Sequence, residues 1–135
     1  MQAIDEARKL LGLRHQLGAR DFRRGRGATD CVGLVVEFLR RLDLEMPDPA
    51  TAKLAVDWRG GTLDAFDAFV PDHWRAVDQD APRRAGDLLI MDKGRHVAVA
   101  VSPHLALTSE KRQGSCLLPM AGLRVHRVYR RESDQ

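Results

Sequence analysis

Apolar residues in the first third of the chain recur at the spacing of an α-helix. The first stretch predicts a helix over residues 2–12, which ends at Gly12. A stronger apolar stripe predicts a second helix over residues 31–42, with Thr29 or Asp30 as its N-cap. This stripe consists of Leu34, Val35, Phe38, Leu39 and Leu42. The intervening residues contain three glycines and many arginines, so an irregular loop is expected over 13–30.

The middle of the chain carries two more patterns of helical spacing. Residues 50–59 and 62–70 predict short helices, and the prolines that flank this part of the chain limit how far they can extend. Trp74 and Val77 are assigned to a connector, and residues 82–86 to a turn.

The hydrophobic period changes to two from Asp87 onward, which predicts short strands. The predicted strands cover residues 88–91, 96–101, 105–109, 115–118 and 124–130. Because the helices come first and the strands follow, we expect an α+β fold with a central helix packed on a small, mostly antiparallel sheet. Neither a repeat nor a linker divides the sequence, so residues 1–135 are expected to form a single domain.

Charge and composition narrow the functional classes only modestly. The chain has 135 residues and a net charge of +3, which does not require a nucleic-acid partner. Arginines gather before Cys31 and near the C-terminus, either as a solvated surface or as a face for an acidic substrate or partner. The first residues lack the pattern of a signal peptide, and no apolar run approaches the length of a membrane span. We therefore expect a protein made in the cytoplasm, without a membrane span.

Cys31 is the strongest candidate for chemistry. It stands at the start of the second predicted helix, where the positive end of the helix is expected to favour the thiolate. His96 opens a predicted strand much later in the chain. A cysteine at a helix start and a histidine on a strand are typical of papain-like thiol hydrolases. The alternatives are a structural Cys31 and a surface His96.

The remaining cysteine and histidines carry weaker signals. There is no CxxC pair, which argues against a disulfide scaffold and the common zinc-ribbon patterns. Cys116 lies in an apolar strand and is interpreted as inert, and a Cys31–Cys116 disulfide stays open as an alternative. His15 lies near the cysteine loop, where it could line a cleft. The others are interpreted as surface or structural residues: His73, His104 and His126.

Three short motifs follow one another along the chain. They are Asp30-Cys31-Val32-Gly33-Leu34, Gly86-Asp87-Leu88-Leu89 and His96-Val97-Ala98-Val99. Together and in this order, they resemble the NlpC-type cysteine peptidases, papain-like enzymes that cut bacterial peptidoglycan stem peptides. The resemblance implies a papain-like NlpC-type α+β fold, Cys31 as the nucleophile, His96 as its partner, and no metal or organic cofactor.

The same family places a third polar residue, commonly histidine, on the strand after the catalytic histidine, where it orients the imidazole. Core-facing valines are expected to put Val99 opposite Leu107 in this hairpin. Ala98 then lies opposite Thr108, on the face that carries His96. Thr108 is therefore the candidate for the third catalytic residue, and its hydroxyl is expected to accept the ring N–H.

The chain departs from the family pattern at Leu13, near which the family usually has a tyrosine close to the nucleophile. A few short segments of the chain also resemble the family members that are encoded in phage and gene-transfer-agent tail clusters. They include Arg14-His15-Gln16 before the cysteine loop and the apolar Val32 directly after the cysteine. This resemblance implies a place in the virion tail, with other tail or hub proteins as partners.

The resemblance also implies a mechanism and leaves alternatives. A Cys31 thiolate would attack the amide of a peptidoglycan stem peptide, with imidazolium at His96 and the Cys31 backbone N–H in the oxyanion hole. No specific nucleic-acid binding is implied. The alternatives are a weak or inactive structural tail-tip or tail-assembly protein that keeps the fold, and an amidase injected into competitor cells.

Overall fold

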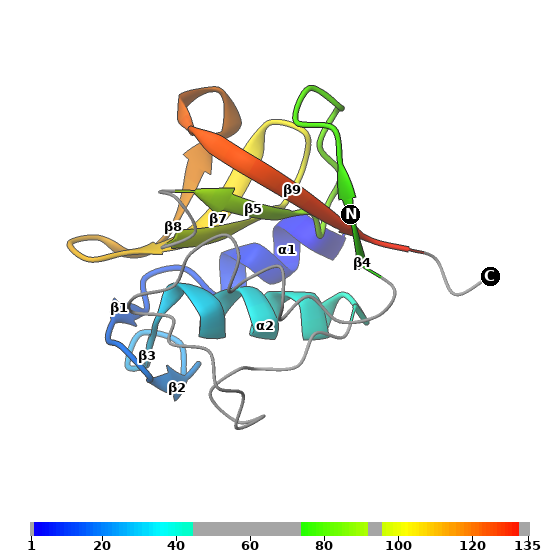
Figure 1. Ribbon diagram of the computed structural model, residues 1–135. Helices are drawn as coiled ribbons and strands as arrows, with labels where there is room; N and C mark the ends of the chain where they lie inside the picture. Colours follow the sequence, from blue (N-terminus) through cyan, green and yellow to red (C-terminus); the bar gives the residue numbers. More distant parts are fainter. Residues whose placement is uncertain (1, 45–73, 92–95, 133–135) are drawn as a thin grey trace.

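Two helices lie on one face of a sheet in the computed structural model, which describes residues 2–44, 74–91 and 96–132. Helix α1 spans Gln2–Lys9, and helix α2 spans Cys31–Arg41. Helix α2 packs against the middle of the sheet (Figure 1). The predicted α+β fold with a central helix is confirmed.

The main sheet has six strands in the order β4-β9-β5-β6-β7-β8, and every neighbouring pair is antiparallel. The strands are β4 (Trp74–Val77), β5 (Leu88–Met91), β6 (His96–Ala100), β7 (Leu105–Glu110), β8 (Gly114–Pro119) and β9 (Val125–Arg131). A short 3-10 helix, η2 (Met120–Gly122), joins the last two. The ends of the five predicted strands differ from those observed by at most one residue.

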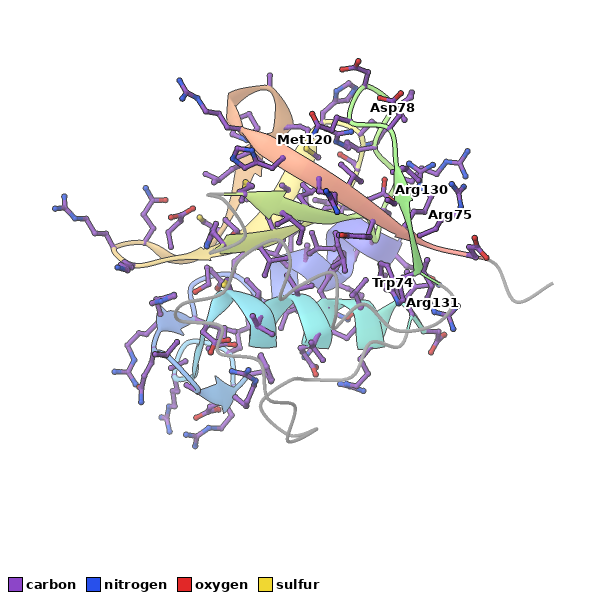
Figure 2. The ribbon with its side chains drawn as sticks, viewed as in Figure 1. Trp74, Arg75, Asp78, Met120, Arg130 and Arg131 are labelled. Carbon is purple, nitrogen blue, oxygen red and sulfur yellow. The ribbon has the colours of Figure 1, made fainter. Side chains whose placement is uncertain are left out.

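Strand β4 corrects one prediction, because Trp74 and Val77 were assigned to a connector. The strand pairs with β9, with Val77 opposite Val128. Its burial does not alternate, since Arg75 and Ala76 are both exposed. A strand of four residues without alternation gives no period-two signal. Trp74 is 8% exposed and belongs to the core, as seen at the start of β4 in Figure 2.

The segment before α2 is more ordered than the irregular loop that was predicted. It forms a small second sheet in the order β1-β3-β2, with strands of two residues each. These are β1 (Arg14–His15), β2 (Arg20–Asp21) and β3 (Ala28–Thr29). Gly18 and Gly25, at φ of 80° and 77°, lie in the turns that connect them. Strands this short carry no periodicity, so the prediction missed them.

The helix boundaries follow local hydrogen bonds. Helix α1 ends three residues before the expected stop at Gly12, because the N–H of Leu10 bonds to Ala7 in a tighter turn. Helix α2 begins as predicted, and its N-cap is Asp30. The helices predicted over 50–59 and 62–70 lie outside the described residues. Among the described helices, none combines the length and the apolar character needed to cross a membrane.

The two faces of the sheet bury different side chains. Val97, Val99 and Val101 join Leu107 in the core beneath the helices. Ala98 and Ala100 belong to a smaller cluster on the opposite face, together with Leu89, Met91, Ala106 and Val128. Val99 pairs with Leu107, so the predicted hairpin register is confirmed.

The Gly86-Asp87 motif holds the sheet together rather than serving chemistry. Asp87 is 1% exposed, and its carboxylate accepts from Arg130 Nε at 2.9 Å and Nη2 at 2.8 Å. It also accepts from the Arg84 N–H at 2.9 Å. Arg130 belongs to β9 and is labelled in Figure 2. Gly86 has a φ of 95°, a backbone conformation that residues with a Cβ rarely adopt, so glycine is favoured at this turn.

Candidate active site

A cavity of about 940 Å³ opens at the start of α2. Its walls come from the β1 segment, the first turn of α2, the start of β6 and the end of β7 with the turn that follows. The lining residues are His15, Leu17, Asp30, Cys31, Val32, His96, Val97, Ser109, Glu110, Lys111, Arg112, Gln113 and Leu118. Cys31 and His96, which are 65 positions apart in sequence, therefore share one solvent-accessible cavity.

Cys31 is placed by the cap of its helix. Asp30 accepts the Gly33 N–H at 2.8 Å through Oδ1, which fixes the first turn of α2. The same carboxylate accepts from the Gly18 N–H at 2.8 Å and from Arg20 Nη1 at 2.9 Å. These bonds tie the β1–β2 turn to the helix start. Asp30 thus serves as a cap, and the thiol next to it is partly buried and lines the cavity.

The electrostatics of Cys31 contradict the expectation of a ready thiolate. Burial, with a smaller contribution from the Asp30 carboxylate, raises the pKa of the thiol to about 11. Backbone groups of Val97, Val32 and Cys31 itself favour the thiolate, but they do not outweigh burial. The helix end that was expected to lower this pKa also brings a capping carboxylate beside the sulfur. At neutral pH the thiol is protonated, so it needs a base before it can attack.

His96 is the candidate base, because it lines the cavity next to Val97, whose backbone contacts the Cys31 thiol, and a hydroxyl holds its ring. Its Nε2 lies 2.8 Å from Thr108 Oγ1, and the Thr108 hydroxyl donates to the Val97 carbonyl at 3.3 Å. Because that hydroxyl proton is engaged, its oxygen accepts the Nε2–H, and we assign this tautomer from the network. Nδ1 is then left with a lone pair. The Thr108–His96 contact expected from the register is present.

Two other side chains of β7 were missed by the sequence analysis. Ser109 is 1% exposed, and its Oγ lies 2.8 Å from His15 Nδ1. Glu110 places Oε1 3.7 Å from His96 Nε2. The signal for Glu110 was available, because strand alternation puts it on the same face as Thr108, two residues away. Ser109 had no such signal, because its partner comes from the distant β1 strand.

His15 lines the cavity, as its position near the cysteine loop suggested. Leu13, where the family pattern has an aromatic residue, is fully buried in the core. Of these two side chains, the imidazole of His15 thus lines the cavity, and Leu13 contributes to the core instead. The other described histidines, His104 and His126, are not among the lining residues.

Both cysteines are free, so the alternative of a Cys31–Cys116 disulfide is wrong. Cys116 lies on β8 opposite Thr108. Burial and the nearby Glu110 carboxylate raise the pKa of its thiol, which favours the unreactive form. In the described part of the chain, no group of three metal-ligating side chains is close enough together to hold an ion.

Several arginines that were considered for an acidic groove are paired within the protein. Arg20 pairs with Asp30 at 2.9 Å, and Arg23 pairs with Asp21 at 2.7 Å. Arg130 pairs with the buried Asp87. These residues therefore stabilise local structure, and the cations that line the cavity are Lys111 and Arg112, in the turn after β7.

Comparison with solved structures identifies the fold, while neither family models nor curated proteins match the sequence. A Staphylococcus aureus protein of the NLP/P60 family superposes with a TM-score of 0.63 at 16% identity, over 98% of this chain and 41% of that one. The peptidoglycan hydrolase RipB from Mycobacterium tuberculosis gives 0.59 at 19% identity, over 96% and 62%. The chain thus spans less than two thirds of either protein.

The NlpC/p60 domain of the peptidoglycan hydrolase SagA is matched nearly end to end. The TM-score is 0.57 at 20% identity, and the match covers 94% of each chain. The similarity extends over both the helices and the sheet that build the cavity. The chain therefore has the NlpC/P60 fold.

Proposed function

We propose that this protein is a cysteine peptidase or amidase that hydrolyses peptidoglycan stem peptides. The observation that carries the proposal is the shared cavity, in which Cys31 lies beside the start of β6 and His96 is held by Thr108. The proposal is also supported by two proteins of the same fold, SagA and RipB, which are peptidoglycan hydrolases.

The site favours a mechanism in which His96 acts as a general base. As Cys31 Sγ attacks the scissile carbonyl carbon, its proton passes to His96 Nδ1, and the carbonyl oxygen gains negative charge. The Cys31 backbone N–H at the helix start stabilises this oxyanion. The imidazolium then protonates the leaving amine, and water hydrolyses the thioester. The sequence analysis expected a thiolate–imidazolium pair before substrate binds. We propose a neutral thiol and imidazole instead, because a thiol with a pKa of about 11 is protonated at neutral pH.

The test is release of peptides from purified peptidoglycan sacculi. We expect wild-type protein to release stem-peptide fragments and Cys31→Ala to release none. Cys116→Ala is the matched control, because it removes the other free cysteine, which does not line the cavity. Equal release by wild type and Cys31→Ala would refute the enzymatic proposal.

We further propose that the protein acts from a phage or gene-transfer-agent tail, together with tail or hub proteins, at the bacterial cell wall. The support is the sequence resemblance around Arg14-His15-Gln16 and Val32. Purified tail particles from a producing strain are expected to contain the protein at a fixed ratio to the major tail proteins. Particles that lack it would refute this location.

A catalytically weak or inactive tail protein is the second candidate. It is favoured by the raised pKa of Cys31 and by Leu13, which is buried where the family usually has a tyrosine. In that case the Cys31→Ala variant would assemble into tails normally and infection would be unaffected. Impaired wall penetration by particles that carry Cys31→Ala would exclude this candidate.

A further inference from the structure

The imidazole of His96 has two acceptors near the same nitrogen. Thr108 Oγ1 lies 2.8 Å from Nε2, and Glu110 Oε1 lies 3.7 Å from it. Both acceptors belong to β7 and stand two residues apart, so they share one face of the strand. The third catalytic position expected from the family resemblance is thus occupied by a hydroxyl, and a carboxylate lies 3.7 Å from the same ring nitrogen.

A hydroxyl alone is a weak partner for a catalytic base. It is neutral, so it orients the ring but does little to stabilise the imidazolium that forms when the thiol proton arrives. A carboxylate within 4 to 6 Å supplies that stabilisation, because opposite charges favour the ionised form. The charge of Glu110 is felt in this part of the sheet, since it also raises the pKa of Cys116 across the strand pair.

Charged and titratable groups approach the cavity from several elements. Helix α2 and its cap bring Cys31 and Asp30, and Asp30 is paired with Arg20. Strand β1 brings His15, whose Nδ1 is engaged by Ser109. The turn after β7 brings Lys111 and Arg112. Glu110 Oε1 lies 3.7 Å from His96 Nε2, and 40% of the Glu110 side chain and 24% of the His96 side chain are exposed.

We propose that Glu110 is a positioning residue for His96. Its carboxylate, 3.7 Å from Nε2, stabilises the imidazolium by charge, while Thr108 accepts the Nε2–H bond. In the attack step, the sulfur–carbon bond forms and the thiol proton moves from Sγ to Nδ1. Glu110 stays ionised throughout and takes no proton. The inference rests on the proposed peptidase function. It assigns orientation of the imidazole ring to Thr108 and stabilisation of its positive charge to Glu110.

The first test measures the His96 imidazole itself and needs no peptidoglycan. Titration of the imidazole by NMR is expected to show a pKa about half a pH unit lower in Glu110→Gln than in wild type, the size typical of a partly exposed ion pair. The shift should shrink at high salt, because exposed charges are screened. Glu132→Gln is the matched control, since Glu132 is similarly exposed but pairs with Arg75 outside the cavity.

The second test separates positioning from substrate binding. Glu110→Gln is expected to lower kcat about fivefold and leave KM unchanged, because the lost charge acts only as the imidazolium forms. Glu110→Asp should restore part of the loss. A raised KM with an unchanged His96 titration would show that Glu110 binds a cationic group of the substrate, and would overturn the proposal.

The outcomes also separate this inference from the proposed function. If wild type hydrolyses nothing while the Glu110→Gln shift of His96 and a slower alkylation of Cys31 are both observed, the positioning role stands and the peptidase proposal fails. If the His96 titration is identical in wild type and Glu110→Gln, the positioning role is refuted, whatever the hydrolysis assay gives.

Discussion

Asp87 and His96 lie at the starts of neighbouring antiparallel strands, and their polar surroundings differ sharply. Asp87 is 1% exposed, and its carboxylate accepts hydrogen bonds from the Arg130 guanidinium and from the Arg84 backbone N–H. His96 keeps 24% of its side chain exposed in a large cavity, with a hydroxyl at 2.8 Å and a carboxylate at 3.7 Å. Buried polar groups with full hydrogen bonding support a fold, whereas titratable groups facing a cavity are available for chemistry.

The two aspartates of the motifs, Asp30 and Asp87, have similar surroundings but differ in how close they lie to the candidate nucleophile. Asp30 and Asp87 are both buried, both paired with an arginine, and both bonded to backbone N–H groups. Each holds a strand or helix start in place. Asp30, however, stands directly beside Cys31, and its charge raises the pKa of that thiol. Structural support and chemical function are therefore coupled at Asp30 and separate at Asp87.

The largest effect is expected for His96→Ala. Removal of the general base should reduce peptide release by about a thousandfold, because the protonated thiol then has no acceptor for its proton. The thermal unfolding midpoint should change little, since the side chain lines an open cavity. Rates and midpoints measured on the same preparations check this. Near wild-type turnover would place catalysis elsewhere.

Asp87→Ala should show the opposite pattern, with a large loss of stability. Truncation leaves the Arg130 guanidinium, 15% exposed, without its carboxylate, and we expect the free energy of unfolding to fall by about 3 kcal/mol. Denaturant unfolding measures this. The control is Asp21→Ala, which breaks the exposed Asp21–Arg23 pair and should leave the unfolding midpoint nearly unchanged. Equal losses in the two variants would contradict the structural role of Asp87.

Thr108→Val should give a smaller effect, mainly on turnover, with a modest loss of stability because the bond from the buried hydroxyl to the Val97 carbonyl is also lost. The valine keeps the shape but removes the acceptor for Nε2–H, so kcat is expected to fall about tenfold. Thr29→Val is the control, because it removes a buried hydroxyl bonded to the Asp30 carbonyl and outside the cavity. A decrease of the same size in both variants would show that the effect is one of stability rather than orientation.

The smallest effect is expected for Asp30→Asn. Asparagine keeps the Oδ1 acceptor for the Gly33 N–H but removes the charge that raises the Cys31 pKa. The thiol pKa should therefore fall, and the alkylation rate of Cys31 should rise at neutral pH. The pH dependence of alkylation in a Cys116→Ala background measures this shift. The substitution also removes the ion pair with Arg20 and the Oδ2 acceptor of the Gly18 N–H, so the variant is compared only after its folding has been checked. An unchanged or higher pKa would show that the Asp30 charge does not reach the sulfur.

The strands and the central helix could be predicted because their signals are local. The period-two pattern of the valines in β6 placed His96, and it fixed the register that brings Thr108 to it. Strand β4 and the small sheet before α2 could not be predicted, because their strands are too short to show a period of two, and β4 also pairs with the distant β9.

The sequence predicted that Cys31, His96 and Thr108 lie close together, but it did not predict the electrostatics of Cys31. The positive end of α2 was visible in the sequence, but the burial that raises the Cys31 pKa depends on how β6 and the β1 segment close over the helix start. The role of Ser109 likewise depends on a contact with His15 across 94 positions. Both the raised pKa of Cys31 and the Ser109–His15 contact depend on tertiary packing, which local sequence patterns do not reveal.

In the proposed mechanism, catalysis depends most on His96 acting as the base for Cys31. Its most direct test is the alkylation rate of Cys31 by iodoacetamide at neutral pH, in a Cys116→Ala background, with and without His96→Ala. Because a thiol with a pKa of about 11 is almost entirely protonated at that pH, we expect the rate to fall about tenfold or more when the imidazole is removed. Equal alkylation rates in the two proteins would refute the role of His96 as the base for Cys31.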